Sequence, residues 1–363
     1  MRFPTLILSF VLALSLLSSD AAWSADFWKG YDAYRKGDYA TALQEWEPLA
    51  EQGYVEAQNF LGRMYRYGEG VAQSHETSAM WYERADDASL KGNYATALRE
   101  WESFAEQGHA LAQFFLGMMY REGVRVAQSY EDAAGWYRRA AEQGYAPAQF
   151  ALGRSYHFGH GVSQNYETAA EWYRRAAEQE YAPAQFALGI LYYFGDGVSQ
   201  NYETAAEWYR RAAEQGDPDS QFLLGGMYER GEGVSQDYGT AVELYQLAAE
   251  HGLAEGQGAL GRMFMRGEGI PQHFEAGTEL FRLAAEQGDA TAQFHLGIAY
   301  IAGFGVPQDR IYGHVWLNLS ASSGHEQAGE WRDRVAGEMT PEQITEAQKL
   351  AAECLKNDYK GCS

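Results

Sequence analysis

The sequence predicts an all-α protein, built as a solenoid of stacked helical hairpins with a helical cap at its C-terminal end. Two observations predict this fold. A Leu-Gly pair recurs every 36 residues from Leu116 to Leu296, and each interval holds two helical patterns joined by a glycine-containing loop. A constant period of this length is typical of supersecondary units that stack on their neighbours and share a continuous core.

The first helix of a unit is clearest in residues 145–180, which residues 181–216 copy with five differences. Ala148, Leu152 and Tyr156 lie at i, i+4 and i+8, which places them on one stripe of a helix. The glycine of each Leu-Gly pair would weaken this helix unless it allowed a neighbour to approach closely, so we assign it to packing.

The loop and the second helix follow from the next residues. Gly159 and Gly161 can adopt positive φ in the loop, and Asn165 is suited to cap the helix that begins after it. In that helix, one face carries alanines with Trp172 and Tyr173. Because the Trp-Tyr pair recurs at the repeat period, we assign it to the core rather than to a sugar-stacking platform. The helix ends at a glycine in most copies, which is a C-terminal signal.

The N-terminal part departs from the constant period. Residues Asp32–Gly53 recur 55 residues later as Asp87–Gly108, which indicates a duplicated block and a short inserted unit at 87–108. We expect a half-unit at 25–53, a repeat array at 54–324 and a cap at 325–363. Thr340 and the residues after it form a helix start in that cap.

Residues 1–24 predict a cleavable signal peptide. Arg2 gives the charged start, Thr5–Leu17 the apolar segment, and Ala22-Trp23-Ser24 a small-x-small cleavage site before Ala25. An apolar run this short does not comfortably span a bilayer, and no later segment is long and apolar enough to do so. We therefore expect a periplasmic or secreted protein without an integral membrane segment. An uncleaved anchor is the alternative.

Composition and cysteine usage narrow the partners. The formal net charge is -22, which repels phosphate backbones and makes nucleic acid a poor partner. The chain has two cysteines, Cys354 and Cys362, both in the C-terminal tail. An even count in an exported chain favours a disulfide between them.

The repeat pattern AQxxLGxxYxxGxGVxQ(D/N)YxxAxxWYxxAAEQG resembles the Sel-one-like repeat (SLR) family, whose α/α repeats are related to the tetratricopeptide type. The resemblance covers roughly 54–324 and implies a right-handed superhelix that acts as an interaction scaffold. Three positions depart from the pattern. Arg125 replaces the second loop glycine, Gly258 stands where several copies have Phe, and Glu180 replaces the glycine after the second helix, where the helix either runs on or ends in a costlier turn.

If the units curl as tetratricopeptide-like repeats do, the first helices line the concave side. The positions opposite the core stripe then form what we call the candidate stripe, with one triplet in each repeat. The triplets are Asn59/Arg63/Arg66, Phe114/Met118/Arg121, Phe150/Arg154/His157, Phe186/Ile190/Tyr193, Phe222/Gly226/Glu229, Gly258/Arg262/Met265 and Phe294/Ile298/Ile301.

Aromatic and arginine anchors among apolar contacts suit a protein or peptide partner. We therefore take the candidate partner-binding residues to be Arg63, Arg66, Met118, Arg121, Arg154, His157, Ile190, Tyr193, Glu229, Arg262 and Met265. The alternative is that the Phe residues belong to the core and the other positions drift neutrally.

Chemistry beyond binding is not indicated. His157 and His160 have an H-x-x-H spacing in one repeat only, without further metal ligands nearby in the sequence. No nucleophile elbow, P-loop or zinc-protease motif occurs. We expect no cofactor and no catalytic set. Arg174 and Arg175 are expected to make ordinary surface pairs with the glutamates near them.

The sequence thus predicts an exported, non-catalytic scaffold that binds a protein or peptide in its concave groove, in a bacterial envelope or host-contact process. Two alternatives stay open. One is a cell-envelope enzyme of β-lactamase-like type, which the absence of a cysteine pair in each repeat disfavours. The other is a structural component of a polysaccharide or envelope assembly, with an envelope glycan in the groove.

Overall fold

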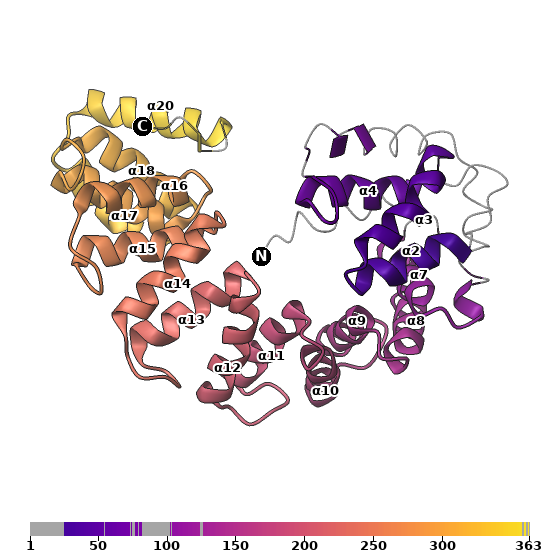
Figure 1. Ribbon diagram of the computed structural model, residues 1–363. Helices are drawn as coiled ribbons and strands as arrows, with labels where there is room; N and C mark the ends of the chain where they lie inside the picture. The colour runs from indigo at the N-terminus through magenta and orange to yellow at the C-terminus, as the bar shows by residue number, and fades with distance from the viewer. Residues whose placement is uncertain are drawn as a thin grey trace. The chain divides into compact units, whose positions relative to one another are not determined.

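The computed structural model describes residues 25–53, 55–72, 74, 77–78, 80–81, 102, 104–123, 126–357, 359–360 and 362. The predicted signal peptide, Arg125 and most of the short unit predicted at 87–108 lie outside the described residues. Within them, all regular secondary structure is helical, as predicted (Figure 1). The chain divides into two compact units, Met1–Gln143 and Gly144–Ser363, which we call the N-terminal and the C-terminal unit.

The N-terminal unit contains helix pairs that pack in chain order, α2 with α3, α3 with α4, and α7 with α8. Their aromatic core is centred on Trp46, which is fully buried and stacks on Phe60 with 4.6 Å between ring centroids. The bounds of these helices are α2 Ala25–Arg35, α3 Tyr39–Glu51, α4 Val55–Tyr67, α7 Ala110–Glu122 and α8 Tyr130–Glu142.

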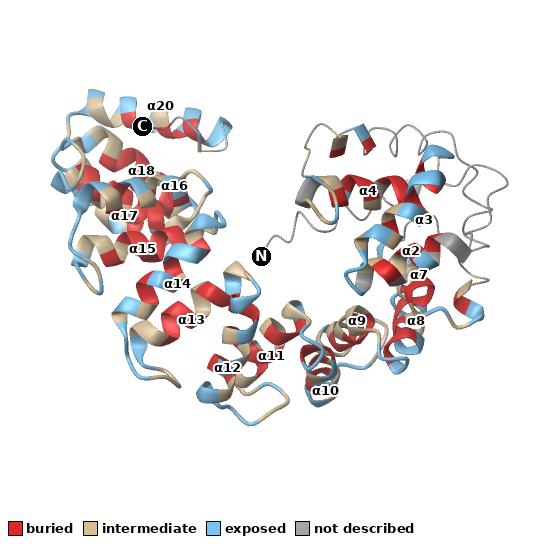
Figure 2. Ribbon diagram, in the orientation of Figure 1, coloured by how far each residue is buried: buried red, intermediate tan, exposed pale blue. Residues whose placement is uncertain are grey.

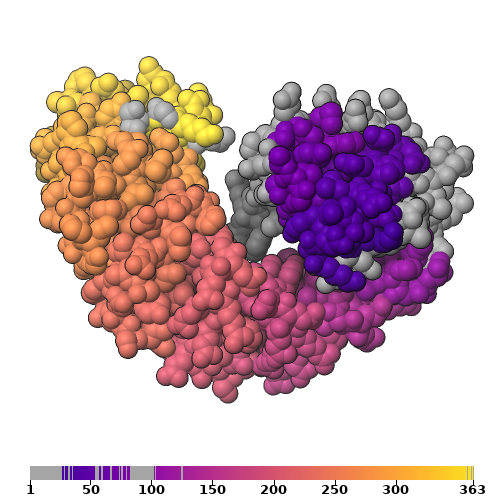
Figure 3. Space-filling model, viewed as in Figure 1, coloured from indigo at the N-terminus to yellow at the C-terminus, as the bar shows by residue number. Residues whose placement is uncertain are grey.

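The C-terminal unit is a solenoid of helical hairpins. The first helices of its repeats are α9 Ala146–Phe158, α11 Ala182–Phe194, α13 Pro218–Arg230, α15 Ala254–Arg266 and α17 Ala290–Ala302. The second helices are α10 Tyr166–Ala177, α12 Tyr202–Glu214, α14 Tyr238–Glu250, α16 Phe274–Ala285 and α18 Arg310–Ser322. Each second helix packs on the first helix of its own repeat and, up to α16, on the first helix of the next. Figure 3 shows these repeats as one continuous body that follows the chain order.

The second helices begin and end as the sequence predicts. The Asn165 carboxamide accepts a hydrogen bond from the backbone N–H of Thr168 (2.9 Å), which caps α10. Alanines and tyrosines of these helices face the inside of the stack, where Ala169 and Tyr173 are buried (Figure 2). The hairpins therefore share a core that continues from repeat to repeat.

Close helix approach explains the Leu-Gly pair. A Cβ added to Gly189 on α11 would lie 2.6 Å from a ring atom of Tyr209 on α12. The same contact recurs in the preceding repeat between Gly153 and Tyr173, also at 2.6 Å. The assignment of this glycine to packing is confirmed, because only a residue without a side chain leaves room for the tyrosine ring at this distance from the first helix.

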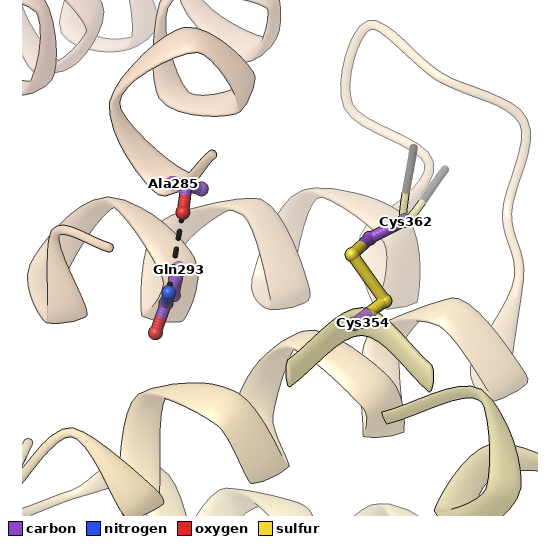
Figure 4. The surroundings of a disulfide bond; sticks show 4 residues. All are labelled: Ala285, Gln293, Cys354 and Cys362. Atoms are coloured by element: carbon purple, nitrogen blue, oxygen red, sulfur yellow. Dashed lines mark hydrogen bonds between the residues drawn. A yellow bond between two sulfur atoms is a disulfide. The ribbon is translucent and has the colours of Figure 1, made fainter. Parts of the chain in front are cut away.

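Each first helix of the C-terminal unit has a buried glutamine, and on α11 this residue ties three helices together. Gln185 on α11 donates a hydrogen bond from Nε2 to the carbonyl of Ala177 at the end of α10 (3.1 Å), and its Oε1 accepts one from Nε2 of Gln215 after α12 (2.7 Å). Gln293 repeats the bond to the previous helix, at Ala285 (3.2 Å; Figure 4). We call this arrangement the glutamine clamp.

The repeat of α13 lacks half of the clamp. Gln221 on α13 still donates to the carbonyl of Ala213 (3.2 Å), but its buried Oε1 has no hydrogen-bond partner. His251 stands after α14, where the neighbouring repeats have Gln215 and Gln287. An unpaired buried acceptor costs about 1–3 kcal/mol, so this repeat is held less firmly than its neighbours.

The cap covers the last repeat. α19 Ala328–Ala336 and α20 Pro341–Lys356 both pack on α18, and Trp316 of α18 is completely buried. The predicted helix start at Thr340 is present as a capping box with Gln343. Since α20 closes the surface on which another hairpin would stack, it ends the array.

The predicted disulfide between Cys354 and Cys362 joins the end of α20 to the tail, with 5.4 Å between the Cα atoms (Figure 4). Both cysteines are buried in the same apolar cluster as Trp316, Phe281 and Ala285. The bond therefore holds the tail against the last repeat. A closed loop this short stabilises the fold by at most about 3 kcal/mol.

Glu180 ends α10 in a left-handed turn. Its φ is 61°, close to the 86° of Gly216 at the equivalent place after α12. The costlier of the two outcomes predicted for this position is therefore the one observed, since a residue with a Cβ is strained in this region by about 1–2 kcal/mol.

Replacing Glu180 by glycine is expected to raise the free energy of unfolding by about 0.5–1 kcal/mol, because the removed strain exceeds the entropy that glycine adds to the unfolded chain. Urea unfolding followed by circular dichroism measures the change. The matched control, Gly216→Glu, is expected to lower the stability by a similar amount. Equal midpoints for both variants and the parent would contradict this expectation.

Two helix-interior glycines are expected to respond in opposite ways to alanine. Gly189→Ala pushes a methyl group into Tyr209 and should cost about 1–3 kcal/mol. Gly258→Ala should stabilise by up to about 1 kcal/mol, since its added Cβ would meet only a carboxylate oxygen of Asp289 at 4.0 Å. The pair is compared by thermal unfolding, and a destabilised Gly258→Ala would show that this position is not open.

Candidate partner-binding surface

In four triplets the first member is a Phe that contacts the tyrosine on the second helix of its own repeat; these are Phe114, Phe150, Phe186 and Phe222. Phe150 contacts Tyr173 with 5.6 Å between ring centroids, and Phe186 contacts Tyr209 at 6.1 Å. These rings are half-buried, whereas Phe294 is 9% exposed and stacks on His325 at 4.4 Å. The Phe residues thus support the hairpin and show one side to solvent, which is intermediate between the two interpretations drawn from the sequence.

In the N-terminal unit the candidate residues are engaged within the chain. The Arg63 guanidinium lies 3.7 Å from the Glu69 carboxylate and 5.6 Å from the ring centre of Tyr34. Arg121 forms an ion pair with Glu122 at 2.6 Å, and Met118 is half-buried. The side chain of Arg66 lies outside what the structure describes.

Arg154 and His157 lie on α9 among aromatic rings. The Arg154 guanidinium is 5.9 Å from the ring centres of both Phe150 and Phe158. His157 meets the ring of Tyr166 edge-on, with 5.1 Å between centroids. Burial lowers the pKa of His157, Asp196 of the next repeat raises it, and Arg154 lowers it further. The imidazole therefore favours its neutral form more than an exposed histidine does.

Ile190 and Tyr193 pack on the cluster formed by α12 and α13. The Tyr193 hydroxyl donates a hydrogen bond to the Glu232 carboxylate (2.9 Å), which also accepts one from Arg230 (2.9 Å). Burial and the bond to Glu232 raise the pKa of Tyr193. Tyr193 is thus a fixed, half-buried phenol that links its repeat to the next one.

The remaining candidates lie on α13 and α15. The Glu229 carboxylate accepts a hydrogen bond from the hydroxyl of Tyr245, and Arg262 lies 3.8 Å from that carboxylate. Met265 covers Gly277 of α16, where an added Cβ would be 2.9 Å from the Met265 sulfur. The structure therefore brings Glu229 and Arg262 together and places Met265 against its own repeat.

Contacts between neighbouring repeats involve several of the positions at which residues 145–180 differ from residues 181–216. In the repeat of α11 the third member of the triplet, Tyr193, bonds Glu232, which lies between the two loop glycines of the following repeat. Asp196 occupies the equivalent position, 39 residues after His157, and its charge raises the pKa of His157. Substitutions at 157/193 and at 160/196 thus change residues that meet between neighbouring repeats.

The prediction that Arg174 and Arg175 pair with nearby glutamates is wrong. Arg174 donates a hydrogen bond to the hydroxyl of Tyr192 in the next repeat (3.0 Å), and the Arg175 guanidinium stacks over the half-buried Trp172 ring at 4.5 Å. The same two contacts recur one repeat later at Arg210 and Arg211. The predicted core role holds for the buried tyrosine of the Trp-Tyr pair and only partly for the tryptophan.

One junction cannot form the arginine–tyrosine bond. Gln246 on α14 and Phe264 on α15 stand at the positions of the arginine and the tyrosine, and Phe264 has no hydroxyl. Gln246 instead bonds Glu250 in its own helix (2.9 Å). The Arg262–Glu229 pair, between the first helices, crosses the same junction.

The sequence interpretation missed the glutamine clamp. Its signal was nevertheless present, because a glutamine recurs three places before the core leucine of the first helix, and in most repeats again just before the glycine that follows the second helix. A polar residue repeated at a core position indicates a buried hydrogen bond.

The described residues form neither a metal site nor a membrane-spanning helix. Among the described residues, no group of three or more His, Cys, Asp or Glu side chains could hold a metal ion. Nor does any helix in the described ranges have both the length and the hydropathy needed to cross a membrane.

Known proteins share this architecture. The solved structure of a Sel1 repeat protein from Oxalobacter formigenes is 30% identical, covers 90% of this chain and 93% of its own chain, and superposes with a TM-score of 0.58. The human and rat proteins named "Protein sel-1 homolog 2" are 29% and 34% identical over 115 residues. That match covers 32% of this chain and 14% of the length of these relatives.

The family model described as the Sel1 repeat matches seven segments, residues 55–85, 110–145, 146–181, 182–217, 218–253, 254–289 and 290–325. Together they span more than half of the sequence, and their boundaries follow the hairpins of the structure. The SLR resemblance is confirmed: the chain belongs to the Sel1 repeat family.

Proposed function

We propose that this protein is an exported, non-catalytic scaffold that holds a protein or peptide partner along the candidate stripe of its C-terminal unit. A Sel1 repeat scaffold supports a role as a protein-interaction repeat protein. The stripe as the binding surface, the export and a bacterial envelope or host-contact process are parts of the proposal.

The observation that carries the proposal is the position of the stripe on the first helices. α13 and α15 contact each other directly across two repeats, as expected for helices on the inner side of a curved stack. Their stripe positions, and those of α9 and α11, include half-buried rings, an isoleucine and arginines that internal contacts hold in place. Pre-ordered aromatic and arginine side chains bind a partner with little loss of side-chain entropy.

The stripe also varies between repeats, while the clamp glutamine of the first helix and the Leu-Gly pair recur in each repeat of the C-terminal unit. Arg154 on α9 corresponds to Ile190 on α11 and to Gly226 on α13. The conserved geometry therefore presents a different side chain at each step, so that a bound chain would meet a particular sequence of contacts. This is how a rigid solenoid selects one partner over another.

The candidate stripe is tested as a binding surface with the combined variant Arg154→Ala/His157→Ala/Tyr193→Ala. The partner is first identified by a photo-crosslinking residue placed at Ile190 in the native host, with the same residue at Glu207 on α12 as the control position. Purified partner should then bind the triple variant about thirtyfold more weakly or worse, since losing central anchors costs about 2 kcal/mol or more.

The matched control is Glu171→Ala/Glu207→Ala/Glu243→Ala, three exposed glutamates of the second helices. This variant should bind as the parent does, and circular dichroism should show equal helicity for both triple variants. Unchanged affinity in the stripe variant, with its fold intact, would refute the stripe as the binding surface.

Export predicts a defined N-terminus. Protein recovered from the native host should begin at Ala25 and carry the Cys354–Cys362 bond, because disulfides persist in oxidising compartments. Intact-mass spectrometry with and without reduction measures both features. A full-length protein that starts at Met1 in the cytosolic fraction would contradict the proposed export.

A further inference from the structure

A histidine lies in the interface that joins the last repeat to the one before it. His295 is on α17, and its ring stacks on Phe281 of α16, with 5.0 Å between the ring centroids and 19° between the ring planes. Phe281 is 1% exposed and belongs to the apolar core that the two repeats share. The imidazole of His295 is therefore part of the surface along which α17 packs on the preceding repeat.

Ring contacts continue from this histidine to the segment after α18. Phe294, the residue before His295 on α17, meets it edge-on with 5.5 Å between centroids. Phe294 in turn stacks on His325 at 4.4 Å and meets Trp331 of α19 edge-on at 6.4 Å. One set of rings thus links α16, α17 and the cap. We call the four consecutive members the ring stack, which consists of Phe281, His295, Phe294 and His325.

The other repeats have a residue without a titratable group at the position of His295. In the repeat of α7 it is Phe115, and in the first four repeats of the C-terminal unit it is Ala151, Ala187, Leu223 and Ala259. The fold thus accepts a methyl group, a leucine or a phenyl ring at this place. A histidine adds a property that none of these side chains has, which is a charge that depends on pH.

The surroundings of His295 oppose its protonation. Burial is the largest cause, and the charges of Arg262, His325 and Arg266 act in the same direction, so that the pKa of His295 is lowered from 6.5 to about 4. The two arginines come from α15, and His325 comes from the segment after α18. The imidazole is therefore neutral at pH 7, and a proton placed on it would be a buried charge beside cationic neighbours.

The charged groups of the two helices packed on α17 have their own partners. On α16, Arg282 forms an ion pair with Glu279. On α18, burial lowers the pKa of His314, Arg332 of α19 lowers it further, and Asp333 of α19 raises it. The groups that act on His295 are thus the two arginines of α15 and His325, each of which carries positive charge when protonated.

From this arrangement we infer that the ring stack is an acid-sensitive joint: His295 holds the last repeat and the cap on the array while its imidazole is neutral, and loosens them when it takes up a proton. The opened form binds the proton more readily than the folded form does. The stability of the joint is therefore complete above about pH 6.5 and is lost progressively as the pH falls to about 4. The inference concerns contacts within the chain and does not depend on what binds the candidate stripe.

The test measures amide hydrogen exchange of the full chain by mass spectrometry at pH 7 and at pH 4.5. The variant His295→Phe keeps a ring for the stack, as Phe115 has in its own repeat, and cannot be protonated. From pH 7 to pH 4.5, the opening constant of α17 and α18 should rise roughly fiftyfold more in the parent than in this variant, as a pKa of about 4 in place of 6.5 requires. Comparing the proteins at equal pH cancels the pH dependence of the exchange chemistry itself.

Two further variants make the result independent of how well the phenyl ring fits. His295→Ala copies Ala259 of the preceding repeat and removes both the ring and the charge. It should open more readily than the parent at pH 7 and should also lack the additional response to acid. The control His160→Phe removes an exposed histidine from the loop of an earlier repeat and should keep the response of the parent. Circular dichroism at pH 7 checks that all three variants fold.

A response that is lost in both His295 variants and kept in His160→Phe would support the inference. Two results would overturn it. If the parent and both His295 variants respond equally to acid, another group is the sensor. If the parent opens first in the repeats of α9 to α12, the acid-sensitive contact lies elsewhere in the array. Because no partner is added, neither result bears on the proposed role of the candidate stripe.

Discussion

The glutamine clamp is the interaction on which the regularity of the array depends. Alanine and leucine contacts alone would let one hairpin slide along its neighbour, because apolar packing has little directionality. A buried carboxamide does not permit this. Gln185 must reach the carbonyl of Ala177 and the side chain of Gln215 at once. A shift of one turn would leave these buried polar groups unpaired, and the cost of each is comparable to a large part of a repeat's stability.

Because the clamp fixes the register between hairpins, each of the other recurring residues has a defined contact. The Leu-Gly glycine meets a large side chain of the second helix, which is Tyr209 at Gly189 and Phe281 at Gly261, and Arg174 and Arg210 each bond a tyrosine of the next repeat. The copy beginning at Tyr181 keeps the clamp residues of the copy before it and differs from it at the stripe and at the loop. Some of the differing residues meet across a repeat boundary, as Tyr193 meets Glu232.

The sequence was sufficient to predict the all-α solenoid, the hairpin in each repeat, the packing role of the Leu-Gly glycine and the disulfide. Periodicity carries this information, since a residue type that returns every 36 positions must occupy equivalent sites. It was not sufficient to predict which partners Arg174 and Arg175 choose, because the nearby glutamates, Trp172 and the tyrosine of the next repeat all lie within reach of a long side chain. Nor could it show that Glu229 and Arg262 meet, because their distance depends on how closely two first helices approach.

The missing arginine–tyrosine bond between α14 and α15 has a mechanical consequence. At this junction the second-helix side has lost its polar link, and the repeat that precedes it has an unpaired acceptor at Gln221. The ion pair between Glu229 and Arg262 remains on the first-helix side. The apolar cluster shared by α14 and α15 remains, but a junction with a polar link on one side only bends more easily about that side, so the C-terminal unit should bend more easily here than at the α12/α13 junction. Stretching or compressing the array would then be absorbed there, while the hairpins on either side move as rigid blocks.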